Sequence, residues 1–195
     1  PALGLMKIDG TERKTMVEQG SGAIWHPDGK HVLYGKVPRV FALRDLEKGT
    51  EQEFMAQNFQ WLGPETYTPD GKWLLCLTPK PWNQYAVSAD FKVLCRCNPQ
   101  ATGCRADASP DGNEVAWVSG GGCRHAKLDV EAKSDAVYTE IKMLVSPDKK
   151  RGQYPYHPDW APDGKYLAFD DIEGPGADAG AECPGSSGAW DIYVF

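Results

Sequence analysis

One ten-residue pattern occurs four times in this chain and constrains its fold more than any other feature. Each copy carries Pro-Asp-Gly near its centre, and a β-prone run follows. The copies cover residues 25–34, 67–76, 108–117 and 160–169. Their glycines, at positions 29, 71, 112 and 164, are 42, 41 and 52 residues apart. A period of roughly 40 to 50 residues is typical of the blades of a propeller.

The repeated turn has a local physical cause. Proline fixes φ at the first corner, aspartate bonds its own backbone, and glycine supplies the position with positive φ. The runs after the turns are largely apolar, which is typical of short strands buried on both faces. Each Pro-Asp-Gly therefore predicts a hairpin between the first two strands of a repeating unit.

Further β-prone runs complete the units. Third strands are expected over residues 40–43, 85–88, 126–130 and 191–195, and fourth strands over 52–55, 92–95 and 137–141. Residues 3–8 and 14–17 resemble a third and a fourth strand that have no first pair before them. Four antiparallel strands make one propeller blade. No stretch has strong helical periodicity, so we expect little helix.

The last repeat carries a resemblance to a known family. Residues 160–169 (WAPDGKYLAF), followed by 191–194 (DIYV), resemble the TolB-type WD40-like (PD40) repeat. The resemblance covers nearly the whole chain and implies an all-β, small β-propeller of four-stranded antiparallel blades. The family includes periplasmic interaction scaffolds, propeller domains of prolyl-oligopeptidase-like enzymes and some sugar-active enzymes. It therefore favours a fold more strongly than a function.

The repeat also predicts how the chain is divided. We expect a single domain over 1–195, with blades at about 22–57, 64–97, 105–145 and from about 155. Pairing of the N-terminal and C-terminal strands would close about four blades into a ring and remove the open edges. The alternative is a fragment of a five- or six-bladed propeller. Residues 145–153 are an insertion that we expect to form a surface loop.

Charge and hydropathy exclude some partners. The formal net charge is −6, which argues against nucleic acid, because phosphate binding needs a basic face. No apolar run approaches the ~18 residues of a transmembrane segment. A membrane-associated complex is still compatible with this composition.

Six cysteines suggest an oxidising compartment, periplasmic or extracellular. We expect at least two disulfides, with candidates Cys97, Cys104, Cys123 and Cys183, whereas Cys76 lies on a predicted strand as a buried free thiol. A zinc site can be drawn from Cys95, Cys97, Cys104, Cys123 and His125. Its spacings are not the usual ones, and disulfides explain the same residues more simply, so no metal site is predicted.

The loops between second and third strands lie on one face of a propeller and lengthen along this chain. Long loops on a rigid scaffold often bind ligands. The predicted binding face contains Trp82, Asn83, Tyr85, Arg124, His125, Asp170, Asp171 and Asp178. The acidic loop 170–182 offers oxygen ligands to Ca²⁺, but its spacing matches no EF-hand, so no cofactor is expected.

No catalytic constellation is found in the sequence. Gly-x-Ser-x-Gly and P-loop patterns are absent. We therefore expect a non-enzymatic, extracytoplasmic scaffold that binds another protein or serves as a subunit of a larger assembly. One alternative is the propeller part of a hydrolase or lyase whose catalytic residues lie elsewhere. Another is a small-ligand or carbohydrate binder that uses Trp82, Tyr85 and the acidic loop.

Overall fold

The computed structural model of this chain describes residues 2–37, 40–55, 63–79, 81–120, 122–132, 136–146, 154–173 and 189–194. The described part is almost entirely antiparallel β-structure, with one short 3-10 helix, η1 (Val130–Ala132). This confirms the predicted all-β class. None of the described helical structure is long and apolar enough to cross a membrane.

Three sheets are complete four-stranded blades formed by consecutive strands. Blade 1 consists of β3 (Ser21–Trp25), β4 (His31–Val37), β5 (Val40–Asp45) and β6 (Glu51–Met55). Blade 2 consists of β7 (Gly63–Tyr67), β8 (Trp73–Leu77), β9 (Gln84–Ser88) and β10 (Leu94–Arg96). Blade 3 consists of β11 (Cys104–Ala108), β12 (Glu114–Ser119), β13 (Gly122–Leu128) and β14 (Tyr138–Val145). These bounds lie close to the predicted ranges, although β13 begins earlier than expected.

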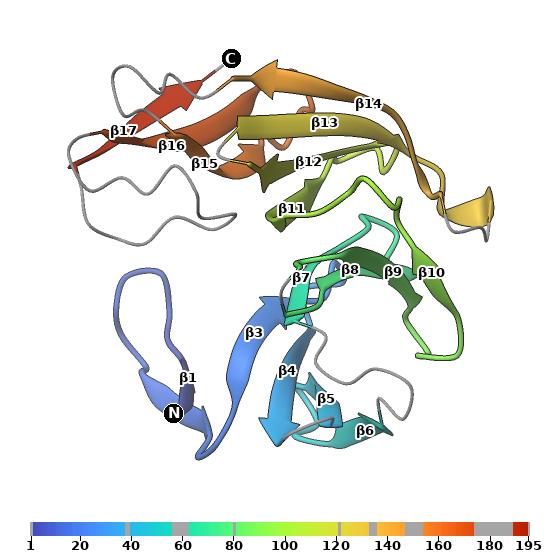
Figure 1. Ribbon diagram of the computed structural model, residues 1–195. Coiled ribbons are helices and arrows are strands. Elements are labelled where there is room, and N and C mark those ends of the chain that lie inside the picture. The colour runs from blue at the N-terminus through green and yellow to red at the C-terminus, as the bar shows by residue number, and fades with distance from the viewer. Residues whose placement is uncertain are drawn as a thin grey trace.

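Blade 4 has three described strands, β15 (Tyr154–Trp160), β16 (Leu167–Glu173) and β17 (Ala189–Val194). A separate two-stranded sheet near the N-terminus pairs β1 (Leu3–Leu5) with β2 (Lys14–Val17). In Figure 1 the blades follow one another along an arc, and their first strands β3, β7, β11 and β15 lie on its concave side.

The Pro-Asp-Gly turns join first and second strands in all four blades, as predicted. Their glycines have φ between 68° and 75°. Successive turns also stack: a Cβ atom added at Gly71 would lie 2.8 Å from His26 Nε2 of the preceding turn, and one at Gly112 would lie 3.5 Å from Pro69. The turns therefore form one face of the molecule, and the loops between second and third strands lie on the opposite face.

The hydrophobic core lies between blades rather than within one sheet. Trp117 and Tyr138 of blade 3 are fully buried, with ring centroids 5.1 Å apart, against Trp73 and Leu75 of blade 2. A second cluster joins blades 1 and 2 through Leu33, Phe41, Tyr67, Leu74, Cys76 and Val87. Because a single sheet cannot bury both of its faces, each blade depends on its neighbours for stability.

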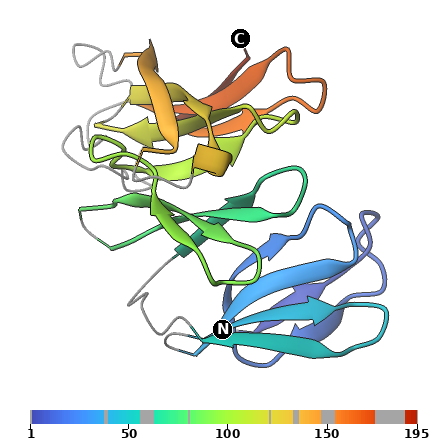
Figure 2. The same cartoon turned by 90° about the vertical axis from the view of Figure 1, so that its right-hand side faces the viewer.

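The predicted pairing of the N-terminal and C-terminal strands is wrong. Within the described residues, β1 pairs only with β2, and β17 pairs only with β16. The Leu3 side chain packs beside Gly20, next to the ring of Tyr34 on β4. This contact holds the N-terminal segment against blade 1. Figures 1 and 2 both show the two ends of the chain far apart, and the arc is open between them.

Candidate binding site at the centre of the arc

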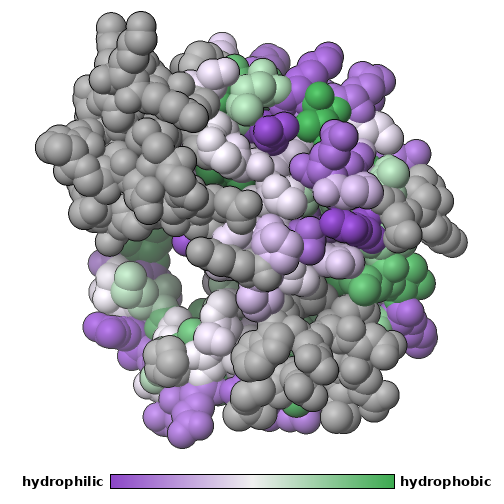
Figure 3. Space-filling model, in the orientation of Figure 1, coloured by the Kyte–Doolittle hydropathy of each residue, from purple (hydrophilic) through white to green (hydrophobic). Residues whose placement is uncertain are grey.

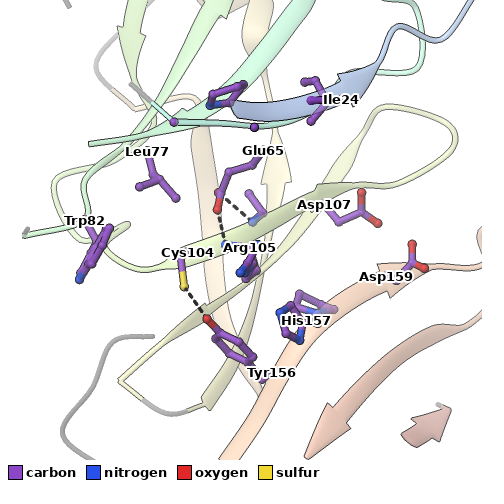
Figure 4. A pocket seen from close by; sticks show the side chains of 16 residues that line it. Ile24, Glu65, Leu77, Trp82, Cys104, Arg105, Asp107, Tyr156, His157 and Asp159 are labelled. Atoms are coloured by element: carbon purple, nitrogen blue, oxygen red, sulfur yellow. Dashed lines mark hydrogen bonds between the residues drawn. The ribbon is translucent and has the colours of Figure 1, made fainter. Parts of the chain in front are cut away.

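A cavity of about 740 Å³ lies where the first strands of the four blades approach one another. Its walls come from β3, β7, β11 and β15, together with Leu77 and Trp82 beside the loop that follows β8. Figure 3 shows the molecule hollowed in this central region, and Figure 4 shows the side chains that surround it. Leu77 and Trp82 place one end of this central cavity beside the loop that follows β8, on the face that carries the loops between second and third strands.

Every first strand is irregular where it borders the central cavity. The register shifts between Ser21 and Ile24, Pro64 and Thr66, Cys104 and Asp107, and Tyr156 and Asp159. In three blades the fifth residue before the turn proline has positive φ: Gly22 at 60°, Arg105 at 60° and His157 at 45°. Bulges of this kind re-aim side chains and are frequent beside binding sites. Left-handed backbone at arginine or histidine costs about 1 kcal/mol or more.

Glu65 connects blade 2 to the bulge of blade 3. Its carboxylate accepts the backbone N–H of Ala106 at 2.9 Å and makes a second, very short bond with the N–H of Arg105. The bulge removes these two N–H groups from the strand ladder, and the carboxylate satisfies them instead. Burial raises the pKa of Glu65 to about 7 against the opposing effect of the two hydrogen bonds.

Asp107 makes the corresponding connection from blade 3 to blade 4. Its Oδ2 accepts the backbone N–H of Trp160 at 2.8 Å. Burial raises the pKa of Asp107 to about 6, and the nearby charge of Asp159 adds to the rise. In Figure 4 Asp107 and Asp159 lie on the same side of the central cavity. Asp107 is half-buried and Asp159 is exposed, and two nearby carboxylates repel each other, which favours a cation beside them.

One guanidinium group also borders the cavity. The Arg105 Cζ lies 5.8 Å from the centre of the Tyr156 ring, which is a cation–π arrangement. His157 Nδ1 lies 2.8 Å from Asp170 Oδ2. The cavity therefore combines three carboxylates, from Glu65, Asp107 and Asp159, with aromatic surface at its wall and rim. This arrangement suits a basic side chain better than an anion.

Trp82 is the predicted binding-face residue that lines the central cavity. It is half-buried, with φ of 58°. Its carbonyl accepts the N–H of Gly103 at 2.9 Å, which ties the loop to the connection between blades 2 and 3. A Cβ atom at Gly103 would lie 1.9 Å from the Val118 carbonyl oxygen, so only glycine fits there. The loop that carries Trp82 is thus held in place by backbone contacts.

Asn83 and Tyr85 have structural contacts instead. Asn83 Oδ1 accepts a hydrogen bond from Arg96 Nη2 at 3.0 Å, and its backbone forms a bridge with Thr102. Tyr85 lies on β9 and packs against the core cluster between blades 1 and 2. Neither lines the central cavity.

Arg124 and His125 lie within β13 rather than on a loop. The hairpin between β12 and β13 is short, because Ser119 and Gly122 are paired. The His125 Nε2 atom lies 3.3 Å from Glu114, and the ring lies 6.3 Å from that of Trp160. The prediction of a long third loop carrying these two side chains is therefore wrong.

The acidic candidates separate in the structure. Asp170 lies on β16 next to the cavity and contacts His157, as described above. Asp171 follows it on the same strand, paired with Pro155 and Asp191. Asp178 and most of the 170–182 loop, whose oxygen ligands were considered for Ca²⁺, lie outside the described residues.

The cysteines contradict the prediction of at least two disulfides, although the candidate Cys104 is disulfide-bonded. Cys76, Cys95, Cys97 and Cys123 are buried and form no disulfide, which leaves at most one bridge among six cysteines rather than two or more. Cys97 packs between blades 2 and 3, and Cys123 packs between blades 3 and 4, so the two lie in different core clusters. Burial raises the pKa of Cys123 to about 12. The Cys104 sulfur lies 3.7 Å from the Tyr156 hydroxyl, and Cys183 lies outside the described residues.

The sequence contained a signal for the cavity that was missed. Asp107 and Asp159 are both the third residue before the turn proline, and Glu65 is the fourth. Carboxylates at matching positions on the innermost strands of neighbouring blades must lie close together around the axis. Aligning the first strands, as well as the turns and loops, would have identified them.

No known protein-family description matches this chain, and no curated protein sequence matches it. Comparison of structures does give similar proteins. Hydrazine synthase from Kuenenia stuttgartiensis superposes with a TM-score of 0.59 at 16% identity, over 88% of this chain and 50% of the other. A putative TolB from Agrobacterium tumefaciens gives 0.50 at 15% identity, over 88% and 78%.

A chain of a nidogen/laminin complex gives a TM-score of 0.65 at 12% identity, over all of this chain and 76% of the other. These identities show the fold alone, and the fold is that of TolB-like and WD40 propellers, which confirms the resemblance seen in the sequence. This chain spans half the length of the hydrazine synthase chain.

Proposed function

We propose that this chain is a non-enzymatic β-propeller scaffold that binds another protein, and that a lysine or arginine of the partner enters the central cavity. The observation that carries the proposal is the cluster of three carboxyl groups, Glu65, Asp107 and Asp159, in a cavity that is also lined by Trp82 from a loop between second and third strands. A partner's ammonium or guanidinium group would neutralise Asp107 and Asp159, together with Glu65 when it is ionised, and form charge-assisted hydrogen bonds. Trp82 at the rim offers the rigid aromatic surface that is typical of interface hot spots.

The comparisons support protein binding in a general way. A chain with this fold is part of a nidogen/laminin complex, and propellers present loops of several blades on one rigid face. Placement outside the cytoplasm stays a prediction. Its argument from cysteines is weakened, because four of the six form no disulfide.

A photo-crosslinking experiment tests the proposal. A photoreactive amino acid is placed at position 82 or, as a control on the opposite face of the same blade, at Lys72 in the Pro-Asp-Gly turn, whose side chain is 71% exposed. In extracts of the native source we expect position 82 to give a covalent adduct with one partner polypeptide, and position 72 to give none.

Charge variants then test whether the cavity carboxylates contribute to binding of the partner. Asp159→Asn removes one cavity charge and should reduce the position-82 adduct at least about tenfold. Asp163→Asn, in the turn on the opposite face, should leave it unchanged. Adducts of equal yield from both faces, or an adduct that ignores Asp159→Asn, would contradict binding at the central cavity.

A further inference from the structure

The turn of blade 1 gathers three metal-ligand side chains on the face opposite the central cavity. His26, Asp28 and His31 form this cluster, here called the blade-1 histidine cluster, and their ligand atoms lie within 4.8 Å of one another. Asp28 Oδ2 lies 2.7 Å from His31 Nδ1 and 3.0 Å from His26 Nδ1. Two imidazoles thus face one carboxylate oxygen.

The backbone of the hairpin fixes this arrangement. His26 donates its N–H to the carbonyl of His31 at 2.9 Å, so the two residues are opposite each other across the turn. Asp28 at the turn corner uses Oδ1 to accept the N–H groups of Lys30 at 2.8 Å and His31 at 3.1 Å. That leaves Oδ2 directed at the imidazoles. The three side chains are therefore placed together before any ligand is present, which lowers the cost of binding one.

The other turns show that the fold does not need these histidines. Where blade 1 has His26, blade 2 has Thr68 and blade 3 has Ser109, and their hydroxyls bond the turn aspartates at 2.7 Å and 2.6 Å. Where blade 1 has His31, the other blades have Trp73, Glu114 and Tyr166. A hydroxyl is enough to stabilise the turn, and only blade 1 replaces it with an imidazole and adds a second imidazole opposite.

A further carboxylate lies behind His31. Asp45 Oδ2 is 3.7 Å from His31 Nε2, the ring nitrogen that faces away from Asp28. Asp45 is buried, and Lys48 Nζ contacts the same oxygen at 2.9 Å. The usual support of a metal-binding histidine is a hydrogen bond from its second ring nitrogen to a carboxylate. At 3.7 Å this contact is longer than a hydrogen bond, so the His31 ring must move slightly toward Asp45 to form one. The neighbouring blade supports His26, whose ring packs edge-on against Tyr67 with centroids 4.9 Å apart.

From this geometry we propose that His26 Nδ1, Asp28 Oδ2 and His31 Nδ1 bind a divalent transition-metal ion, with Zn²⁺ as the probe. Tetrahedral Zn²⁺ with bonds of about 2.0–2.2 Å needs ligand atoms about 3.3–3.5 Å apart. The distances from Asp28 Oδ2 are 2.7 and 3.0 Å and all ligand atoms lie within 4.8 Å of one another, so side-chain rotations that move these atoms by about 1 Å are enough to reach that value. The three side chains keep 21% to 35% of their surface exposed, so a fourth position is open to water, and the ion displaces imidazole protons as it binds.

Calorimetric titration of the chelator-treated, full-length chain with Zn²⁺ tests the proposal. The wild type should bind one Zn²⁺ ion per chain and should gain thermal stability when the ion is bound. His26→Thr copies Thr68 of blade 2 and keeps the turn folded, and it should bind at least about 100-fold more weakly. Asp45→Asn should cost about tenfold, because it acts through His31.

His125→Ala is the matched control, because His125 also pairs with a carboxylate, Glu114 at 3.3 Å, and its loss should leave Zn²⁺ affinity unchanged. Circular dichroism confirms that each variant is folded. Equal affinity of the wild type and His26→Thr would overturn the proposal and would assign any binding to other groups, such as the cysteines. A wild type that binds no Zn²⁺ up to about 100 μM would overturn it as well.

Discussion

At the scale of single residues, Glu65 has the clearest consequence for stability. Its pKa is about 7 in the folded chain, against an ordinary value of 4.5. The folded state therefore keeps a proton that the unfolded chain has already lost. The free energy of unfolding must then fall as the pH rises from about 4.5 to about 7, and the loss is complete above pH 7. Asp107 adds a similar fall between 3.8 and about 6.

Glu65→Gln removes the first of these contributions. We expect the variant to show a smaller loss of stability between about pH 6 and pH 7 than the wild type, measured by urea unfolding at each pH. Glu47→Gln, in the exposed turn after β5, is the control and should keep the wild-type dependence. An unchanged slope in Glu65→Gln would mean that Glu65 is ionised throughout this range.

The cysteines give a second prediction at this scale. Burial raises the pKa values of Cys76, Cys97 and Cys123, so these residues stay as thiols that alkylating reagents attack slowly. Without a reducing agent, the native chain should react slowly, and the unfolded chain should gain at least four alkyl groups. Intact mass spectrometry counts them. Fewer than four would restore the original expectation of two or more disulfides.

At the scale of elements, the stacking of the Pro-Asp-Gly turns makes some of their glycines harder to replace than others. Gly29 and Gly71 both have positive φ, near 68° and 70°. Nothing lies within 4 Å of a Cβ at Gly29, whereas a Cβ at Gly71 would be 2.8 Å from His26 Nε2. Alanine at either position costs about 1 kcal/mol or more through its backbone. Only Gly71→Ala must also displace a side chain of the neighbouring blade, the imidazole of His26.

We therefore expect Gly71→Ala to destabilise the chain by at least about 1 kcal/mol more than Gly29→Ala, measured by chemical unfolding. Adding His26→Thr to Gly71→Ala should recover most of this excess, because the shorter side chain vacates the space. Equal effects of the two alanine substitutions would show that the turns do not stack in solution.

The sequence predicted the strands well and the site poorly, for a physical reason. Turn chemistry is local, so Pro-Asp-Gly and the β-prone runs determined the hairpins and most strand bounds. The bulges are not local in this way. Arg105 and His157 adopt left-handed backbone that their residue types disfavour. Arg105 is held by Glu65 of the neighbouring blade, and His157 is held by Asp170 of the next strand in its own blade. The positions of the cavity carboxylates relative to one another depend on how the blades stack. The pattern of residues along a single strand contains no information about that stacking.

At the scale of the whole molecule, stability should be divided among the interfaces between blades. The core clusters join blade 1 to 2, 2 to 3 and 3 to 4, which is the pattern of proteins built from neighbouring repeats. The sheet of β1 and β2 stands apart from this series. Most of its side chains are exposed or half-buried, including Met6 and Ile8 just after β1, and Leu3 provides its contact with Gly20 and Tyr34.

Deletion of residues 1–10 tests which arrangement holds the molecule together. A ring closed through the N-terminal strand would lose several kcal/mol, on the order of the total stability of a domain. In the observed arc the deletion removes β1, unpairs β2 and exposes the surface that Leu3 covers, which costs about 1 kcal/mol. For a chain of this size that corresponds to a fall in Tm of about 2–4 °C.

We expect this small shift in a thermal melt followed by circular dichroism, with the remaining blades still unfolding cooperatively. Loss of the cooperative transition would instead support the closed-ring arrangement. Only an N-terminal strand that bridges the first and last blades could destabilise all blades when it is removed.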